Sequence, residues 1–183
     1  TNIVGDNDAR YINMGTFHSV FSRILHTEAA HIGYDSNFTI YDQSDSRSLI
    51  KSIIKDMKLD DKVYKPSTVA DTISMSKNKL ISAQQYASNA QLVQADVMRK
   101  MPELRNIYLK YAERCKTSNA MDFDDLLLNT FKLLSSNEEI RAKYSQRFTY
   151  ILVDEYQDTN FAQQAIVTLL AKDHRRICVV GDD

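Results

Sequence analysis

The chain has 183 residues, of which 43% are hydrophobic, and a formal net charge of −1 at pH 7. This size and apolar content are enough for a packed core and exclude a disordered tail, while four Gly and two Pro are too few for a β-sandwich or barrel with many tight turns. The apolar runs are too short to span a bilayer, the N-terminus lacks an export-signal pattern, and Cys115 and Cys178 show no CxxC spacing. We therefore expect a cytoplasmic protein without a disulfide framework or zinc site.

Charge is divided unevenly along the chain. Residues 43–116 carry 14 Lys or Arg against 8 Asp or Glu, whereas residues 1–42 and 117–183 each have an acidic surplus. This asymmetry is typical of a segment that faces a polyanion beside an acidic site. A solvated, Lys-rich helical surface explains it equally well.

A short β-like run at residues 11–14 precedes the first predicted helix. Apolar residues recur at helical spacing after Thr16 until Gly33, a residue that commonly ends helices. The pattern predicts a strand, a turn and an amphipathic helix. The apolar positions are Phe17, Val20, Phe21, Ile24, Leu25, Ala29 and Ile32.

Five more helices are predicted in the middle of the chain. Ser44 or Asp45 can cap the second helix, Pro66 can start the third, Pro102 suits the first turn of the fourth, and Asp122 is a candidate N-cap of the fifth. The supporting positions are Leu49, Ile50, Ile53, Ile54 and Met57; Val69, Ile73 and Leu80; Leu104, Ile107, Tyr108, Tyr111 and Cys115; Phe123, Leu126, Leu127, Phe131 and Leu134; and, for the sixth helix, residues 137–145.

Two features of these helices allow a functional and a structural interpretation. Asp122, Asp124 and Asp125 could hold a metal ion, but an N-cap followed by two acids in the first helical turn is the simpler account. Tyr108 and Tyr111 could stack on bases, but their helical spacing favours a place in the core.

The pattern changes near the C-terminus. Residues 149–153 and 176–180 have the continuous apolar character of fully buried strands, and residues 161–171 between them form an amphipathic helical pattern. This order predicts a βαβ unit with parallel strands and a right-handed crossover. The predicted fold class is therefore α/β, mostly helical.

Acidic residues follow both predicted strands. Asp154 and Glu155 come after the first strand, and Asp182 and Asp183 after the second, so a parallel sheet would place all four at one ligand crevice. Mg²⁺ prefers one or two carboxylates together with phosphate oxygens and water. We expect Asp154 to hold Mg²⁺ and Glu155 to orient or deprotonate a water in nucleotide hydrolysis. An exposed strand end with a helix-capping acid is the alternative.

Three short motifs carry a family resemblance. "GTFHS" at residues 15–19, "VDEYQDTN" at 153–160 and "VVGDD" at 179–183 together resemble motif Ib, motif II (the Walker B element) and the start of motif III of the UvrD/PcrA/Rep superfamily 1 DNA helicases. The resemblance implies a partial RecA-like parallel sheet of the P-loop NTPase fold, without its P-loop strand, and a large all-α insert like subdomain 1B. The implied domains are residues 1–19 and 147–183 of motor domain 1A and residues 20–146 of the insert.

The resemblance also implies roles for residues around the nucleotide. Asp154 would coordinate Mg²⁺, Glu155 would be the catalytic base, and Asp182 would belong to the ATP-binding set. Gln157 and Asp158 would connect the nucleotide site to the DNA side, with Gln157 counted among the catalytic residues. Helix capping is the structural alternative for Gln157 and Asp158.

The DNA-binding residues implied by the resemblance lie in "GTFHS". Thr16 would contact phosphate, Phe17 would stack on a base, and His18 could do either. Phe17 also begins the first amphipathic helix, so a place in the core remains open. In the insert, the candidate phosphate contacts are Lys77, Lys79, Arg99 and Lys100.

The activity implied by the resemblance is that of a longer helicase. Such a protein uses ATP and Mg²⁺ to translocate 3′ to 5′ on single-stranded DNA and to unwind single-strand/duplex junctions in DNA repair or replication. No GxxxxGK[ST] occurs in the 183 residues, so we expect this piece to be inactive by itself. The resemblance implies that its partners include the rest of the helicase chain, with the P-loop strand and a second RecA-like domain. We expect the unpaired sheet edge of the piece to be covered by self-association or by a rearranged segment. A RecB/AddA-like recombination nuclease-helicase and a non-catalytic helical nucleic-acid- or protein-binding module are the alternatives.

Overall fold

The computed structural model describes residues 12–182 and has an α/β fold in which helices predominate. Within this range, no helix combines the length and apolar character needed to cross a membrane. The helices are α2 (Phe17–Glu28), η1 (Ala29–Ile32), α3 (Gln43–Asp56), α4 (Pro66–Asn78), α5 (Ala83–Ser88), α6 (Ala90–Met98), α7 (Leu104–Thr117), α8 (Phe123–Ser136), α9 (Glu138–Arg147), η2 (Tyr156–Asp158) and α10 (Phe161–Ala171). The strands are β1 (Thr39–Tyr41), β2 (Ala120–Asp122), β3 (Ile151–Val153) and β4 (Ile177–Val179).

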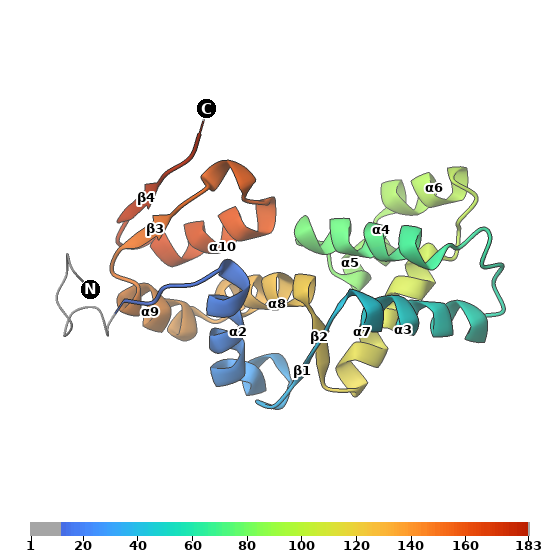
Figure 1. Cartoon of the computed structure of the whole chain (residues 1–183), viewed down its shortest axis with the longest axis horizontal. Helices are drawn as coiled ribbons and strands as arrows, with labels where there is room; N and C mark the ends of the chain where they lie inside the picture. The colour runs from blue at the N-terminus through green and yellow to red at the C-terminus, as the bar shows by residue number, and fades with distance from the viewer. Residues whose placement is uncertain (1–11, 183) are drawn as a thin grey trace.

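The helices build two hydrophobic cores, one in each half of the molecule (Figure 1). Helices α2, α8, α9 and α10 share the first core, near β3 and β4, and helices α3, α4, α5 and α7 share the second. Leu25 in the first core and Ile53 and Ile107 in the second are completely buried. Each such side chain contributes about 1.5–3 kcal/mol to stability relative to full exposure.

The predicted helices are confirmed, and their ends follow from local chemistry. The Thr16 hydroxyl oxygen accepts a hydrogen bond from the Ser19 N–H at 3.3 Å, which caps α2. Gly33 ends η1 in the left-handed region, with φ 69°. The predicted N-cap at Asp122 and the predicted helix start at Pro66 are also observed.

Three local predictions are wrong. Residues 12–14 form no strand, and Tyr11, the remaining residue of that prediction, lies outside the described residues. The N-cap of α3 is Asp42, because a capping box forms with Asp45 at the third helical position. Pro102 precedes α7, which begins at Leu104, so Pro102 lies in the turn before the helix.

A short parallel ladder of β1 and β2 links the two halves. Thr39 pairs with Ala120 and Tyr41 pairs with Asp122. The chain enters the second half after β1 and returns through β2, whose last residue caps α8. The residue that ends this ladder is therefore also the residue that starts a helix of the first core.

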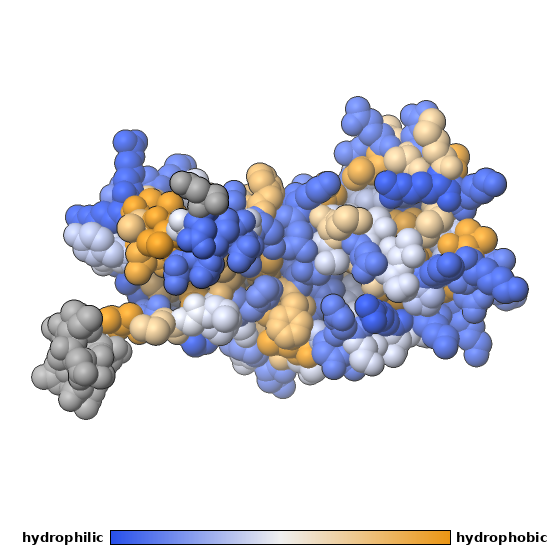
Figure 2. All heavy atoms as spheres, turned by 45° about the horizontal axis from the view of Figure 1, so that its top comes forward, coloured by the Kyte–Doolittle hydropathy of each residue, from blue (hydrophilic) through white to orange (hydrophobic). Residues whose placement is uncertain are grey.

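The predicted βαβ unit is confirmed, but the predicted burial of its strands is wrong. β3 and β4 are parallel, and α10 connects them and packs against α8 and α9. Val153 is buried, whereas Leu152 is 72% exposed and the three residues of β4 are exposed as well. Among residues 12–182 these two strands pair only with each other, so each strand keeps one unpaired edge. The exposed Leu152 shows that one face of the ladder is uncovered as well. Figure 2 shows apolar side chains gathered at that end of the molecule.

Candidate nucleotide site

The carboxyl ends of β3 and β4 lie side by side. Beyond the ladder, the Val180 N–H donates to the Val153 carbonyl oxygen at 2.8 Å, and the Tyr156 N–H donates to the Val180 carbonyl oxygen at 2.9 Å. These bonds continue the pairing into the two acidic segments. The structure therefore places Asp154 and Asp182 at one edge, as the predicted topology requires, while Asp183 lies outside the described residues.

Gln157 connects the two acidic segments directly. Its Nε2 donates to Glu155 Oε2 at 2.6 Å, and its Oε1 accepts from the Asp182 N–H at 3.3 Å. A side chain at Gly181 would crowd this arrangement, because a Cβ there would lie 2.5 Å from Gln157 Oε1. Gln157 therefore holds the Glu155 carboxylate relative to the neighbouring strand, which is a more specific contact than a helix cap.

Glu155 has an unusual backbone conformation. Its φ of 50° and ψ of 46° lie in the left-handed region, which costs a non-glycine residue of order 1–3 kcal/mol. The Glu155 N–H donates to Asp154 Oδ1 at 3.0 Å, and the chain then enters η2. The left-handed residue turns the chain so that Tyr156 reaches β4 while both carboxylates remain exposed to solvent.

The residues at this edge fit a magnesium ion that shares its ligands with a nucleotide. Asp154, Glu155 and Asp182 offer hard oxygen donors. In the part of the chain that the structure describes, no three His, Cys, Asp or Glu side chains converge to hold an ion by themselves. Mg²⁺ does not need such a cage, because it retains water and takes phosphate oxygens as ligands.

Two cavities formed by the described residues lie away from the carboxyl ends of β3 and β4. A cavity of about 300 Å³ lies elsewhere, between α3, α4 and the start of α8, and a second cavity lies beside α9 and His174. Neither cavity includes Asp154 or Glu155. At the carboxyl ends of β3 and β4, the side chains of Asp154, Glu155 and Asp182 are exposed to solvent.

Thr16, Phe17 and His18 lie at the start of α2. Thr16 is exposed and serves as the N-cap, and Phe17 is half-buried against the first core with its ring 5.7 Å from that of Phe21. The His18 ring packs edge-on against Phe123 at 5.6 Å. The helical pattern placed Phe123 on an apolar face, but it is 50% exposed. The contacts described for these residues join them to α2 and α8, not to Glu155 or Gln157.

The sequence comparison decides the family. A family model described as the UvrD/REP helicase N-terminal domain matches residues 1–183. The chain belongs to the UvrD/REP helicase family. Similar relatives are named ATP-dependent DNA helicases: UvrD1 of Mycobacterium leprae (strain TN), 41% identical, and PcrA of Leuconostoc citreum and of Staphylococcus aureus (strain Mu50), 39% and 40% identical. Each alignment covers 98% of this chain but only 23–24% of the relative, so the chain spans about a quarter of their length.

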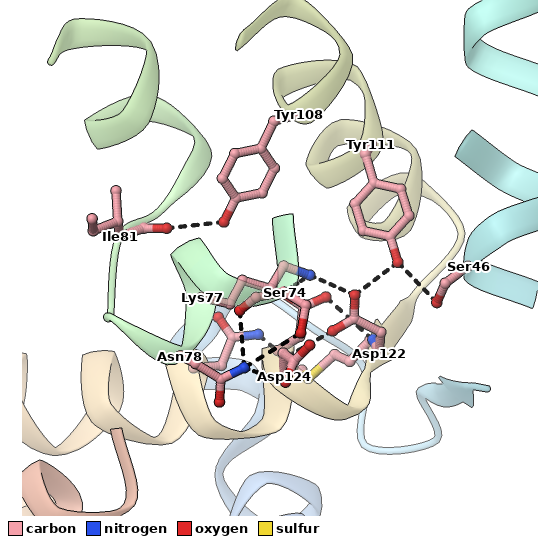
Figure 3. Close-up of polar contacts among 12 residues, drawn as sticks. Ser46, Ser74, Lys77, Asn78, Ile81, Tyr108, Tyr111, Asp122 and Asp124 are labelled. Carbon is pink, nitrogen blue, oxygen red and sulfur yellow. Dashed lines mark hydrogen bonds and ion pairs between the residues drawn. The ribbon is translucent and has the colours of Figure 1, made fainter. Parts of the chain in front are cut away.

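One candidate phosphate contact of this UvrD/REP domain is wrong. Lys77 is 1% exposed, and its Nζ lies 2.6 Å from Asp122 Oδ2 and 2.8 Å from Asp125 Oδ1 (Figure 3). Burial alone would lower the pKa of Lys77, but Asp125 and Asp122 outweigh it and raise that pKa above its usual range. Lys79, Arg99 and Lys100 are exposed, so they remain predictions.

The acidic cluster at the start of α8 is a helix cap and an ion-pair partner. Asp122 and Asp125 form a reciprocal capping box. Tyr111 donates its hydroxyl proton to Asp122 Oδ2 at 2.7 Å (Figure 3). Burial and the neighbouring Asp122 charge raise the pKa of Asp125 to about 6. Sequence reasoning identified the cap but missed Lys77 as its partner, because the two segments are 45 residues apart.

Proposed function

We propose that the protein containing this chain couples hydrolysis of Mg-ATP to 3′-to-5′ translocation on single-stranded DNA and to unwinding of the duplex at single-strand/duplex junctions, in DNA repair or replication. The observation that carries the proposal is the bridge formed by Gln157 between Glu155 and Asp182 at the ends of two parallel strands. Its support is the relatives' name, ATP-dependent DNA helicase, at 39–41% identity.

Each residue at the acidic edge has one role in this proposal. Asp154 holds the magnesium ion, and the ion neutralises charge on the nucleotide phosphates. The Glu155 carboxylate orients the attacking water and accepts its proton. Gln157 fixes the Glu155 carboxylate through its 2.6 Å hydrogen bond. It also accepts a hydrogen bond from the Asp182 N–H, which connects Glu155 to the segment after the neighbouring strand.

The DNA side of the proposal uses the start of α2. Thr16 is exposed and can donate its hydroxyl proton to a phosphate oxygen while its oxygen still caps the helix. His18 and the half-exposed face of Phe17 offer an imidazole and an aromatic ring for bases. Phe123, 50% exposed beside His18, adds a second aromatic face at the same surface.

The same proposal assigns the two ends of the chain to one motor domain. Residues 1–19 and 147–183 are parts of a RecA-like domain, and residues 20–146 form the helical insert. Because no GxxxxGK[ST] occurs in residues 1–183, hydrolysis requires a phosphate-binding segment from outside them. We propose a cytoplasmic location for the protein, as expected for a DNA motor.

The decisive experiment is a Glu155→Gln substitution in the full-length protein, with Asp173→Asn, another exposed acid, as the matched control. Loss of a general base lowers turnover by about 10²–10⁴-fold. We expect this loss in ATP hydrolysis stimulated by single-stranded DNA, with little change in ATP binding, and no loss for Asp173→Asn. The 183-residue chain alone should show no turnover above background. Full activity of Glu155→Gln would contradict the role of Glu155, and an inactive full-length wild type would contradict the proposed function.

A further inference from the structure

A buried lysine ties the second half of the molecule to the first. Lys77 belongs to the last turn of α4, and its ammonium group lies between the Asp122 and Asp125 carboxylates at the start of α8. A buried charge is costly unless its partners are held in good geometry. The pair of carboxylates therefore fixes the end of α4 against α8 at one position.

The next residue, Asn78, extends this connection to a third helix. Its Nδ2 donates to Asp124 Oδ1 at 2.8 Å and to the Ser74 carbonyl oxygen at 2.9 Å. Its Oδ1 accepts from Asn160 Nδ2 at 2.5 Å. One side chain on α4 is thus bonded to the first turn of α8 and to the start of α10, across 46 and 82 residues of sequence.

Asn160 is the residue at which "VDEYQDTN" ends and α10 begins. Its side-chain oxygen accepts from the Gln163 N–H at 2.9 Å, and the Gln163 side chain accepts from the Asn160 N–H at 2.9 Å. This capping box satisfies the helix end without Asn78. The bond from Asn160 to Asn78 is therefore additional to the cap, and its effect is to fix where the cap lies relative to α4.

Glu155 at the acidic edge lies only a few residues before Asn160 in the chain. The Thr159 hydroxyl donates to the Tyr156 carbonyl oxygen at 2.6 Å, which closes the turn that carries Gln157. Gln157 in turn donates to Glu155. A continuous path of short contacts therefore runs from α4, through Asn160 and the Tyr156–Thr159 turn, to the Glu155 carboxylate.

We propose that Asn78, held in place by the buried Lys77, is a positioning residue. It fixes the Glu155–Gln157 turn relative to helix α4. Its catalytic consequence rests on the proposed function, because it acts through Glu155. The structural consequence is independent of the proposed function. We expect the Glu155–Gln157 turn to be less ordered whenever the hydrogen bond between Asn78 and Asn160 is absent.

Two substitutions remove this bond from opposite ends. Asn78→Ala deletes the acceptor, and Asn160→Ser keeps an N-cap but is too short to reach α4. We expect each to lower DNA-stimulated turnover of the full-length protein about tenfold, with the KM for ATP changed less than twofold. Because both break one bond, the double variant should be no slower than the slower single variant. Met75→Ala, which truncates a 55% exposed side chain on the same helix, is the matched control and should match the wild type.

Hydrogen exchange on the same full-length proteins gives a readout independent of turnover. Amides of residues 156–164 should exchange faster in Asn78→Ala and in Asn160→Ser, but not in Met75→Ala. Unchanged exchange and turnover in both variants would overturn the inference, as would single effects that multiply in the double variant. If the wild type hydrolyses no ATP but exchange responds as expected, the proposed function fails while the positioning role stands.

Discussion

At the scale of single residues, the buried ion pairs have the largest predicted effect on stability. Lys77→Ala leaves the Asp122 and Asp125 carboxylates, each 13% exposed, without their buried counter-charge. We expect the free energy of unfolding of the 183-residue chain to fall by about 3–5 kcal/mol, as measured by urea titration. Lys79→Ala should change it by about 0.5 kcal/mol or less, because Lys79 is exposed. Equal stability of the two variants would show that the ion pair contributes nothing.

The buried Glu28 makes the stability of the protein depend on pH. Burial raises the pKa of Glu28, but hydrogen bonds from Lys143 and Tyr144 outweigh it and hold the pKa below 4.5, its ordinary value. Because this pKa is lowered, the ionised Glu28 carboxylate stabilises the fold above pH 4.5. That stabilisation is lost as the pH falls through the lowered pKa.

Glu28→Gln tests this dependence. At pH 7 we expect the variant to be less stable than the wild type by about 1–3 kcal/mol, because a charge-assisted bond to Lys143 is lost. The difference in the free energy of unfolding between the wild type and Glu28→Gln should become smaller as the pH is lowered toward 3. Urea titrations at a series of pH values measure it. Glu139→Gln, an exposed acid on the first turn of α9, is the control. A difference that stays constant with pH would contradict the assigned pKa direction.

At the scale of elements, the helix ends could be predicted where one residue supplies the cap. The pattern of polar and apolar residues gave α10 its bounds and gave α8 its cap at Asp122, because capping depends on contacts within one turn. Burial of the strands could not be predicted from their apolar residues alone. Whether Leu152 is covered depends on which segments lie next to β3, and that is not local information.

The contribution of Thr16 to stability comes from its role as the N-cap of α2. Thr16→Ala removes the acceptor for the Ser19 N–H and should lower the free energy of unfolding by about 1 kcal/mol, whereas Thr16→Ser should retain most of it. Urea titration of the two variants measures the cap. Full stability of Thr16→Ala would show that the 3.3 Å contact does not stabilise the helix.

At the scale of the whole molecule, the unpaired edges of the β3–β4 ladder within residues 12–182, together with its open face, predict self-association of the 183-residue chain. Leu152 is 72% exposed on an uncovered strand, which is typical of a surface that pairs with another chain. We expect the mass measured by light scattering to rise with concentration and Leu152→Lys to suppress that rise. Met98→Lys, which changes a 77% exposed residue on α6 of the other half, should have no effect. A monomer at all concentrations would contradict this prediction.

The sequence by itself determined seven of the helical segments, the order strand–helix–strand at the C-terminus and the placement of Asp154 and Asp182 at one edge, because these follow from periodicity, caps and the geometry of parallel strands. Helices α5 and α6 were not predicted. Only the tertiary structure decided that Lys77 is an internal ion-pair partner, that Asn78 reaches Asn160, and that the strands lie open on one face. The physical reason is that each of these depends on contacts between segments distant in sequence, and neither periodicity nor composition specifies which segments meet.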